Sequence, residues 1–293
     1  MNTDMKGIFT ALLTPFDKND NVNEKELEKL VRHNVNMGAS GFYVGGSTAE
    51  AFFLSTEERK LIMDVVKDTA PEKTLIAHIG SLREKEAHEL SAHANKLGYK
   101  AISSVAPFYF KFTFEEIKGY YIRLAENSDI PMLVYHFPGF SGVNMGMGEI
   151  SQFLSDDRFI GIKYTSNDFF TMEQCKSSFP YKVVYNGYDE MFLCGLSMGA
   201  DGGIGSTYNF MADKFVRIQK LFDEGRISEA QEVQKQANRI ISILCKIGVM
   251  PAEKEVLCQL GFDFGKCRPP FSSPNEEARE LIAKEIIPYV TAL

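Results

Sequence analysis

Short apolar runs alternate with amphipathic segments along most of this chain. Between the runs, apolar residues recur with a helical period, as at Leu27, Leu30, Val31 and Val35, which fall on one helix face. Apolar runs typical of buried strands begin near Ile8, Gly41, Thr74, Lys100, Pro131, Phe159, Lys182 and Ala200. Eight strand–helix units in succession predict an α/β protein whose parallel sheet closes as a (β/α)8 TIM barrel, with a doubly wound open sheet as the alternative.

Three helix starts carry the capping-box pattern, in which a hydroxyl residue and a glutamate three positions later satisfy each other's backbone amides. The pairs are Ser55 with Glu58, Ser81 with Glu84, and Thr113 with Glu116. We therefore expect helices to begin just after these three hydroxyl residues.

The segment beyond the eighth strand keeps a helical period for longer than one barrel unit needs. Its apolar stripe comprises Ile227, Ala230, Val233, Ala237, Ile240, Ile241 and Leu244. We therefore assign residues 1–208 to the barrel up to its eighth strand. Residues 209–293 form the last barrel helix and a C-terminal helical extension, and we expect both parts to make a single structural unit.

Composition narrows the class of protein. The 293 residues are 44% apolar and carry a net charge of −7, which argues against a nucleic-acid partner because such proteins normally present a basic stripe. Neither a membrane-length apolar run nor a signal peptide at the start of the chain is evident, so no membrane contact is expected. The five cysteines form no CxxC pair, which favours reduced thiols in the cytoplasm.

Lys163 stands at the end of the apolar run Phe-Ile-Gly-Ile-Lys-Tyr that begins at Phe159. Burial disfavours an ammonium group and lowers its pKa, so a lysine here can act as a neutral amine that forms a Schiff base with a carbonyl. The alternative is a lysine that extends to the strand end and pairs with a carboxylate. The strand alone does not decide between these two interpretations.

Polar residues gather where the predicted strands end, which is where barrel enzymes place their active sites. The second, fourth, fifth, sixth, seventh and eighth strands end in runs that contain hydroxyls, tyrosines, glycines, a lysine and two acids. These runs include Ser47, Thr48, Tyr109, Tyr135, Lys163, Thr165, Gly187, Asp189, Glu190 and Ser206.

Five short runs together resemble the N-acetylneuraminate lyase / dihydrodipicolinate synthase superfamily, over about residues 6–270. They are Ala-Leu-Leu-Thr-Pro-Phe at 11–16, Gly-Gly-Ser-Thr at 45–48, Pro-Phe-Tyr at 107–109, Gly-Ile-Lys-Tyr-Thr at 161–165 and Asp-Gly-Gly-Ile-Gly-Ser at 201–206. Within the superfamily, the run Gly-Tyr-Asp-Glu at 187–190 is similar to the sialic acid lyases.

The resemblance implies a class I aldolase that cleaves N-acetylneuraminate to N-acetylmannosamine and pyruvate. Lys163 would form the Schiff base with the C2 ketone, and Tyr135 would take part in proton transfer with help from the substrate carboxylate. Tyr109 would reach into the site of a neighbouring subunit of a homotetramer.

The resemblance also implies which residues hold the substrate. Ser47 and Thr48 match the residues that bind the pyruvate carboxylate. The residues that in the superfamily bind the hydroxylated tail of the sugar correspond here to Thr165, Gly187, Asp189, Glu190 and Ser206. Taken alone, Asp189 and Glu190 also suit the start of a helix, where acids meet the helix dipole favourably.

Several positions depart from the superfamily pattern. Phe140 stands where the dihydrodipicolinate synthases carry an arginine for a second carboxylate, which disfavours such a substrate. Ala49 replaces a glycine, which predicts strain in the turn if the position requires a positive φ. His136 replaces an asparagine, and Phe110-Lys111 replaces tyrosine-proline.

Two alternatives stay open from the sequence. One is a lyase for another 2-keto-3-deoxy sugar acid, and the other is a non-catalytic sensor of sugar acids or pyruvate. No histidine has trustworthy ligand spacing, so neither a metal nor a cofactor is expected. An acid–base role for His136 is the weaker alternative to Tyr135.

Overall fold

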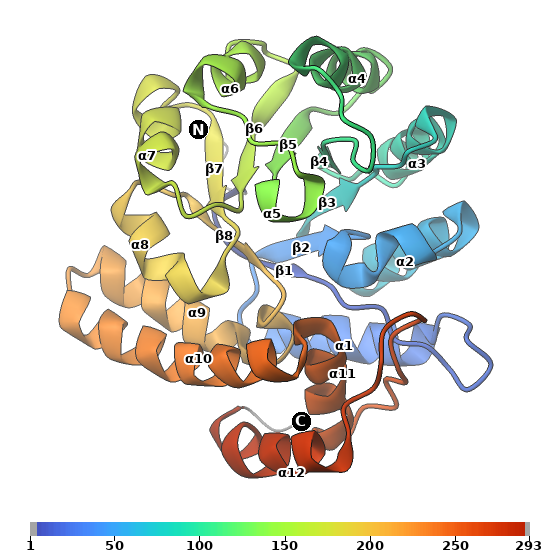
Figure 1. Cartoon of the computed structure of the whole chain (residues 1–293), viewed down its shortest axis with the longest axis vertical. Helices are drawn as coiled ribbons and strands as arrows, with labels where there is room; N and C mark the ends of the chain where they lie inside the picture. The colour runs from blue at the N-terminus through green and yellow to red at the C-terminus, as the bar shows by residue number, and fades with distance from the viewer. Residues whose placement is uncertain (1–4, 291–293) are drawn as a thin grey trace.

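Eight parallel strands close into a barrel in the computed structural model, which describes residues 5–290 (Figure 1). The strands are β1 (Gly7–Ala11), β2 (Gly41–Val44), β3 (Thr74–His78), β4 (Ala101–Val105), β5 (Met132–His136), β6 (Phe159–Tyr164), β7 (Val183–Asn186) and β8 (Gly202–Gly205). Because β8 pairs in parallel with β1, the predicted barrel is confirmed and the open sheet is wrong. The first four residues, on which the expectation about a signal peptide rests, lie outside the described part.

Helices surround the barrel and continue past it. They are α1 (Glu24–Asn36), α2 (Thr56–Thr69), α3 (Glu84–Lys96), α4 (Phe114–Glu126), α5 (Pro138–Ser141), α6 (Met147–Leu154), α7 (Phe169–Ser178), α8 (Phe192–Ser197), α9 (Tyr208–Asp223), α10 (Ile227–Ile247), α11 (Val249–Gln259) and α12 (Glu276–Glu285). Short 3₁₀ turns are η2 (Ser47–Ala49), η3 (Ala51–Phe53), η4 (Asp189–Met191) and η5 (Ile287–Tyr289).

Two of the three predicted capping boxes are present, at the starts of α2 and α4. The third is wrong: α3 begins at Glu84 and its N-cap residue, Arg83, makes no side-chain cap. The Ser81 hydroxyl instead donates to Glu86 (2.8 Å) and accepts from the Arg83 amide (3.1 Å). Ser81 therefore stabilises the turn that precedes the helix and does not cap the helix; serine hydroxyls commonly take either role.

Alternation along the strands produces two apolar layers. One face of each strand points into the barrel, where Phe9, Tyr43, Tyr135, Tyr185 and Ile204 form a buried cluster. The opposite face packs against the surrounding helices, as Ile162 and Tyr164 of β6 do. Lys163 lies between these two residues in the strand, so its side chain belongs to the inward face.

The C-terminal helices pack against the barrel and one another, below the barrel in Figure 1. Helix α10 lies against α9 and α11, and α12 lies against α11. The predicted stripe on α10 is buried except at Ile227, which is 40% exposed. Ile227 is the first residue of the helix, where the chain has only begun to approach its neighbours.

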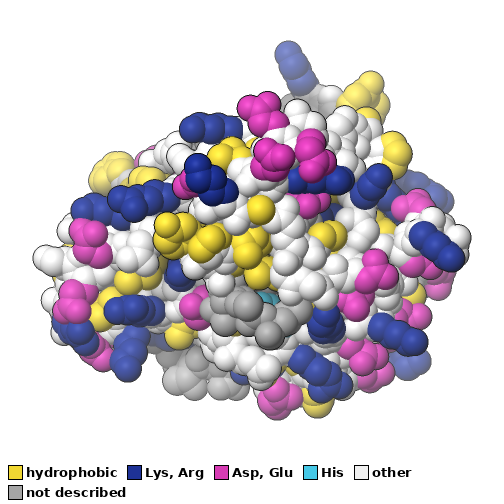
Figure 2. All heavy atoms as spheres, turned by 90° about the horizontal axis from the view of Figure 1, so that it is seen from below, with side chains coloured by type: hydrophobic (Ala, Val, Ile, Leu, Met, Phe, Trp, Pro, Cys, Tyr) yellow, Lys and Arg dark blue, Asp and Glu magenta, His cyan; other side chains and the backbone are white. Residues whose placement is uncertain are grey.

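Acidic and basic side chains are interspersed on the face of the molecule that Figure 2 shows. Among residues 5–290, no helix combines the length and the apolar character that crossing a membrane requires.

Candidate active site

A cavity of about 450 Å³ opens at the carboxyl ends of the barrel strands. Nine of the ten residues predicted from the sequence line it, and Tyr109 does not. The nine are Ser47, Thr48, Tyr135, Lys163, Thr165, Gly187, Asp189, Glu190 and Ser206. Closure of the barrel brings these residues together from β2, β5, β6, β7 and β8 or the turns that follow them.

Lys163 lies at the floor of this cavity and is 5% exposed. In register it stands between Tyr135 of β5 and Tyr185 of β7. Its Nζ is 4.1 Å from the ring centroid of Tyr135 and 4.4 Å from that of Tyr43. Burial lowers the pKa of Lys163 to about 7, and the Asp189 carboxylate only partly opposes this shift. Lys163 forms no ion pair within the described residues. The alternative, a lysine that extends to the strand end and pairs with a carboxylate, is therefore wrong.

Tyr135 is buried beside Lys163 on the neighbouring strand. Burial raises the pKa of Tyr135, and the nearby hydroxyls of Ser47 and Thr165 oppose the shift. The Thr165 hydroxyl approaches without reaching hydrogen-bond geometry, because its Oγ1 has no partner in the described part of the chain. Tyr135 therefore keeps its proton at neutral pH.

The turn after β2 carries Ser47 and Thr48 in the 3₁₀ turn η2. Ala49 completes this turn and does not have a positive φ, so the strain anticipated there is wrong. The left-handed residue is Glu50, with φ 61° and ψ 36°. The Ala49 methyl group is buried without strain, and its carbonyl accepts from Thr14 Oγ1 (2.9 Å).

A buried ion pair fixes this turn to the C-terminal helices. Glu50 Oε1 lies 2.6 Å from Lys254 Nζ on α11, and Glu50 Oε2 accepts from the Arg268 amide (2.7 Å). The sequence does not reveal this contact, because the two charges are far apart in the chain. A glutamate directly after the Ser-Thr-Ala turn was the available signal.

His78 supports the same turn from β3. Its Nε2 accepts from the Val105 amide (3.2 Å), so Nδ1 carries the proton and donates to the Gly45 carbonyl (3.0 Å). Burial, with Arg59 nearby, lowers the pKa of His78. His78 is thus a neutral histidine that supports the turn.

Asp189 connects two sides of the cavity. Its Oδ2 accepts from the Thr207 amide (2.9 Å) and the Thr207 hydroxyl (2.6 Å), while Oδ1 has no partner among the described residues. Burial raises the pKa of Asp189 to about 6. Asp189 is also the first residue of the 3₁₀ turn η4. It therefore lies both at the start of a helical segment and in the cavity.

Two glycines make room for these polar groups. A side chain at Gly205 would collide with Asp189 Oδ1, and one at Gly187 would collide with Thr165 Oγ1. Both positions therefore require glycine because of close approach rather than because of backbone conformation.

Glu253 of α11 is a further residue that the sequence analysis missed. It is 0% exposed, and its Oε1 accepts from Ser206 Oγ (2.6 Å). Burial raises the pKa of Glu253 to about 8. The available signal was a glutamate on the apolar side of the helix that follows Gly248.

His136 lies outside the cavity. Its ring stacks on Tyr164 with centroids 4.9 Å apart, on the face of the barrel wall that meets the helices. Burial lowers the pKa of His136 to about 4. A residue that faces away from the cavity cannot exchange protons with a ligand bound in it, so the acid–base role considered for His136 is wrong.

Two aromatic residues stand at the mouth of the barrel. Tyr109 has φ 79° and is 86% exposed, with its ring edge-on to Phe110. Phe140 lines the cavity and stacks on Phe137 with centroids 4.2 Å apart. An apolar ring thus lines this side of the cavity.

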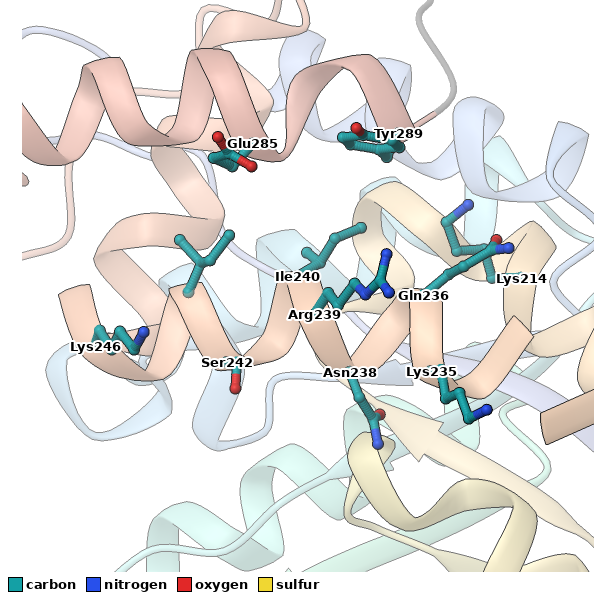
Figure 3. A pocket seen from close by; sticks show the side chains of 11 residues that line it. Lys214, Lys235, Gln236, Asn238, Arg239, Ile240, Ser242, Lys246, Glu285 and Tyr289 are labelled. Carbon is teal, nitrogen blue, oxygen red and sulfur yellow. The ribbon is translucent and has the colours of Figure 1, made fainter. Parts of the chain in front are cut away.

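A larger cavity of about 820 Å³ lies between α10 and the α12–η5 segment (Figure 3). It is lined by Lys214, Lys235, Arg239, Lys246, Glu285 and Tyr289, among others, and by none of the residues predicted to bind substrate. No group of three or more histidine, cysteine, aspartate or glutamate side chains within 5–290 could hold a metal ion.

Known proteins resemble this chain over nearly its whole length. The family model described as the dihydrodipicolinate synthetase family matches residues 4–287. N-acetylneuraminate lyase from Rhizobium meliloti is 41% identical over 98% of this chain and 96% of that protein. N-acetylneuraminate lyase from Clostridium perfringens is 42% identical over 96% of this chain and 98% of that protein.

Solved structures agree with these relatives. A Clostridium difficile structure, described as CdNal in complex with mannosamine, has a TM-score of 0.94 and 40% identity, covering 97% of this chain and 99% of that one. N-acetylneuraminate lyase from Fusobacterium nucleatum has a TM-score of 0.93 and 37% identity, covering 98% of this chain and all of that one. This chain therefore belongs to the dihydrodipicolinate synthetase family, in which its full-length relatives include N-acetylneuraminate lyases.

Proposed function

We propose that this protein is an N-acetylneuraminate lyase, a class I aldolase that cleaves N-acetylneuraminate to N-acetylmannosamine and pyruvate. The observation that carries the proposal is the buried Lys163 amine at the cavity floor, with a pKa of about 7 and with Tyr135 beside it. A lysine that is substantially neutral near pH 7 can attack a ketone, which an ammonium group cannot.

The reaction begins when Lys163 Nζ adds to the C2 ketone of the open-chain sugar acid. Loss of water leaves a protonated imine, which draws electrons from the C3–C4 bond. That bond breaks as the C4 hydroxyl loses its proton, giving the aldehyde of N-acetylmannosamine and an enamine on Lys163. Protonation of the enamine at C3 and hydrolysis of the imine then release pyruvate and restore the amine.

Tyr135 serves as a relay for the C4 proton. Because burial raises its pKa, the phenol is a poor base in its own right. It accepts the C4 proton while it gives its own proton to the substrate carboxylate. Ser47 and Thr48 hold that carboxylate with neutral donors, so an acidic protein binds an acid without a basic cleft.

The tail of the sugar is bound by Thr165, Gly187, Asp189, Glu190 and Ser206. The unpartnered Thr165 Oγ1 and Asp189 Oδ1 support this assignment, because buried polar atoms without partners are costly unless a ligand satisfies them. Phe140 disfavours a substrate that carries a second carboxylate.

The test is pyruvate release from a panel of 2-keto sugar acids, together with borohydride trapping of pyruvate. We expect N-acetylneuraminate to be cleaved with the highest kcat/KM and a single reduced adduct to form on Lys163. Tyr135→Phe should lower kcat by roughly 10²-fold. The neighbouring His136→Asn, whose side chain lies outside the cavity, is the matched control and should retain kcat.

Different results separate the alternatives. A higher kcat/KM for a short 2-keto-3-deoxy acid would replace the substrate but keep the imine. Binding of sugar acids without cleavage, with no trapped adduct, would identify a sensor and refute the lyase. Activity that survives in Lys163→Ala would remove the central step.

We also propose that the protein is a homotetramer in which Tyr109 completes a neighbouring site. Its exposed ring beside Phe110 supports this arrangement, since aromatic side chains are enriched at subunit interfaces. Residues 209–293 are proposed to fold with the barrel as one unit, supported by the packing of α10 on α9. The five free cysteines support a cytoplasmic location.

A further inference from the structure

Glu253 stands behind the part of the cavity that the proposed function assigns to the sugar tail. Val249 and Met250, in the first turn of α11, line the cavity, and Glu253 follows them one helical turn later on the same side. It is fully buried, and its Oε1 accepts from the hydroxyl of Ser206, which does line the cavity. The carboxyl therefore touches a proposed binding residue without lining the cavity itself.

The hydrogen bond to Glu253 decides what Ser206 can offer a ligand. A serine hydroxyl has one proton to donate and two lone pairs that accept. Because the proton is directed to Glu253 Oε1, the remaining capacity of Ser206 Oγ is to accept. An ionised carboxylate can only accept, which fixes the direction of this bond. Burial raises the pKa of Glu253 to about 8, and the protonated carboxyl keeps this direction when its proton is on Oε2, which has no partner among the described residues.

The surroundings keep this arrangement rigid. The Ser206 carbonyl accepts from Asn209 Nδ2 (2.7 Å), and the next residue, Thr207, donates twice to Asp189. Ser206 therefore has little freedom to move its backbone. The Ser206 hydroxyl can still rotate about its side chain. Among the described residues, the hydrogen bond to Glu253 is the one that fixes its orientation.

We propose that Glu253 is a positioning residue for substrate specificity: it holds Ser206 Oγ as an acceptor, so that the site selects a sugar acid whose tail hydroxyl donates a proton to Ser206. This inference rests on the proposed function. It assigns to α11, a helix outside the barrel units, a part in the recognition of polyol substrates.

The first experiment compares Glu253→Leu, Ser206→Ala and the double variant with N-acetylneuraminate and with a short 2-keto-3-deoxy acid. Glu253→Leu should raise KM for N-acetylneuraminate about tenfold, the scale of one mispaired buried hydroxyl, and leave kcat and KM for the short acid near wild type. The double variant should be no worse than Ser206→Ala alone. Glu253→Gln keeps an acceptor oxygen and should recover much of the lost affinity.

Glu255→Leu is the matched control, because Glu255 lies on the same helix but faces Gln259 and Arg279. It should leave KM for both substrates unchanged. Additive losses in the double variant, an equal loss with both substrates, or slower trapping of pyruvate on Lys163 in Glu253→Leu would each overturn the positioning role.

A second experiment uses the wild type and Ser206→Ala, so it does not depend on the folding of a Glu253 variant. Analogues in which one tail hydroxyl is replaced by fluorine cannot donate at that position. The wild type should bind one of these analogues about tenfold more weakly than it binds N-acetylneuraminate. Ser206→Ala should bind that same analogue as strongly as it binds N-acetylneuraminate. Equal binding of all the analogues by the wild type would overturn the inference.

The two proposals fail in distinguishable ways. If the wild type does not cleave N-acetylneuraminate, the proposed function fails and this inference fails with it. If the wild type cleaves N-acetylneuraminate and the Glu253 and fluoro-analogue results are negative, only the positioning role is refuted.

Discussion

At the scale of single residues, three side chains in or next to the cavity have pKa values far from their ordinary ones. Lys163 has a pKa of about 7, Asp189 of about 6 and Glu253 of about 8, in each case chiefly because burial disfavours the charged form. Such shifts cluster at functional sites because chemistry near pH 7 requires groups that titrate there. They also reduce stability, because the unfolded chain would hold each group in its preferred charge state.

We predict that Lys163→Met stabilises the protein at neutral pH. Between about pH 7 and 10.5 the unfolded state binds a proton that the folded Lys163 does not, so the stability of the wild type rises with pH in this window. The gain from Lys163→Met should therefore be largest at or below pH 7, on the order of a few kcal/mol, and shrink towards pH 10.

Urea unfolding of both proteins between pH 6 and 10 measures this difference. Lys96→Met, at an exposed position of α3, is the control and should change the free energy of unfolding by less than about 0.5 kcal/mol. A gain from Lys163→Met that does not vary with pH would contradict the lowered pKa of Lys163.

At the scale of elements, the turn that is proposed to bind the substrate carboxylate is held by contacts from β3 and α11. His78 of β3 donates to the Gly45 carbonyl, and Glu50 forms its ion pair with Lys254 of α11. Helix α11 therefore contacts residues beside the cavity at two places, through Lys254 at Glu50 and through Glu253 at Ser206.

We predict that Glu50→Gln lowers the free energy of unfolding by about 3–5 kcal/mol, because it leaves the Lys254 ammonium buried without its partner. The double variant Glu50→Gln/Lys254→Met should recover a large part of this loss, since no buried charge then remains. Urea unfolding of the two single variants and the double variant gives the coupling. Losses that simply add would mean that the ion pair does not hold the turn.

At the scale of the whole molecule, Tyr109 lies outside the cavity that its own chain forms. The ring is 86% exposed on a backbone with a positive φ, beside the exposed Phe110. A tyrosine that projects from the barrel mouth in this way is suited to enter a neighbouring subunit.

We predict that mixing two inactive variants, Tyr109→Ala and Lys163→Ala, restores activity after subunit exchange. In the mixed assembly a site with an intact Lys163 can receive Tyr109 from its neighbour. Mixing Lys163→Ala with the double variant Tyr109→Ala/Lys163→Ala is the control and should restore nothing. Light scattering should give four times the 32.9 kDa of the chain, and a fully active monomer would refute the assembly.

The sequence by itself determined the barrel and most of the cavity. Strand starts fall within two residues of the predicted positions, because apolar runs and helical periods are local signals. Nine predicted residues line one cavity for a topological reason: the carboxyl ends of parallel strands in a closed barrel must meet at one mouth.

Only the tertiary structure decided how these residues are supported. Local pattern placed a capping box at Ser81, but its hydroxyl bonds to Glu86 instead of capping the helix. It left His136 open as an acid–base group, and in the closed barrel the ring of His136 stacks on Tyr164 of the neighbouring strand. Glu50 with Lys254, and Ser206 with Glu253, are pairs that meet only when α11 docks on the closed barrel. No periodicity marks such pairs, because their burial and pKa depend on packing between segments far apart in the chain.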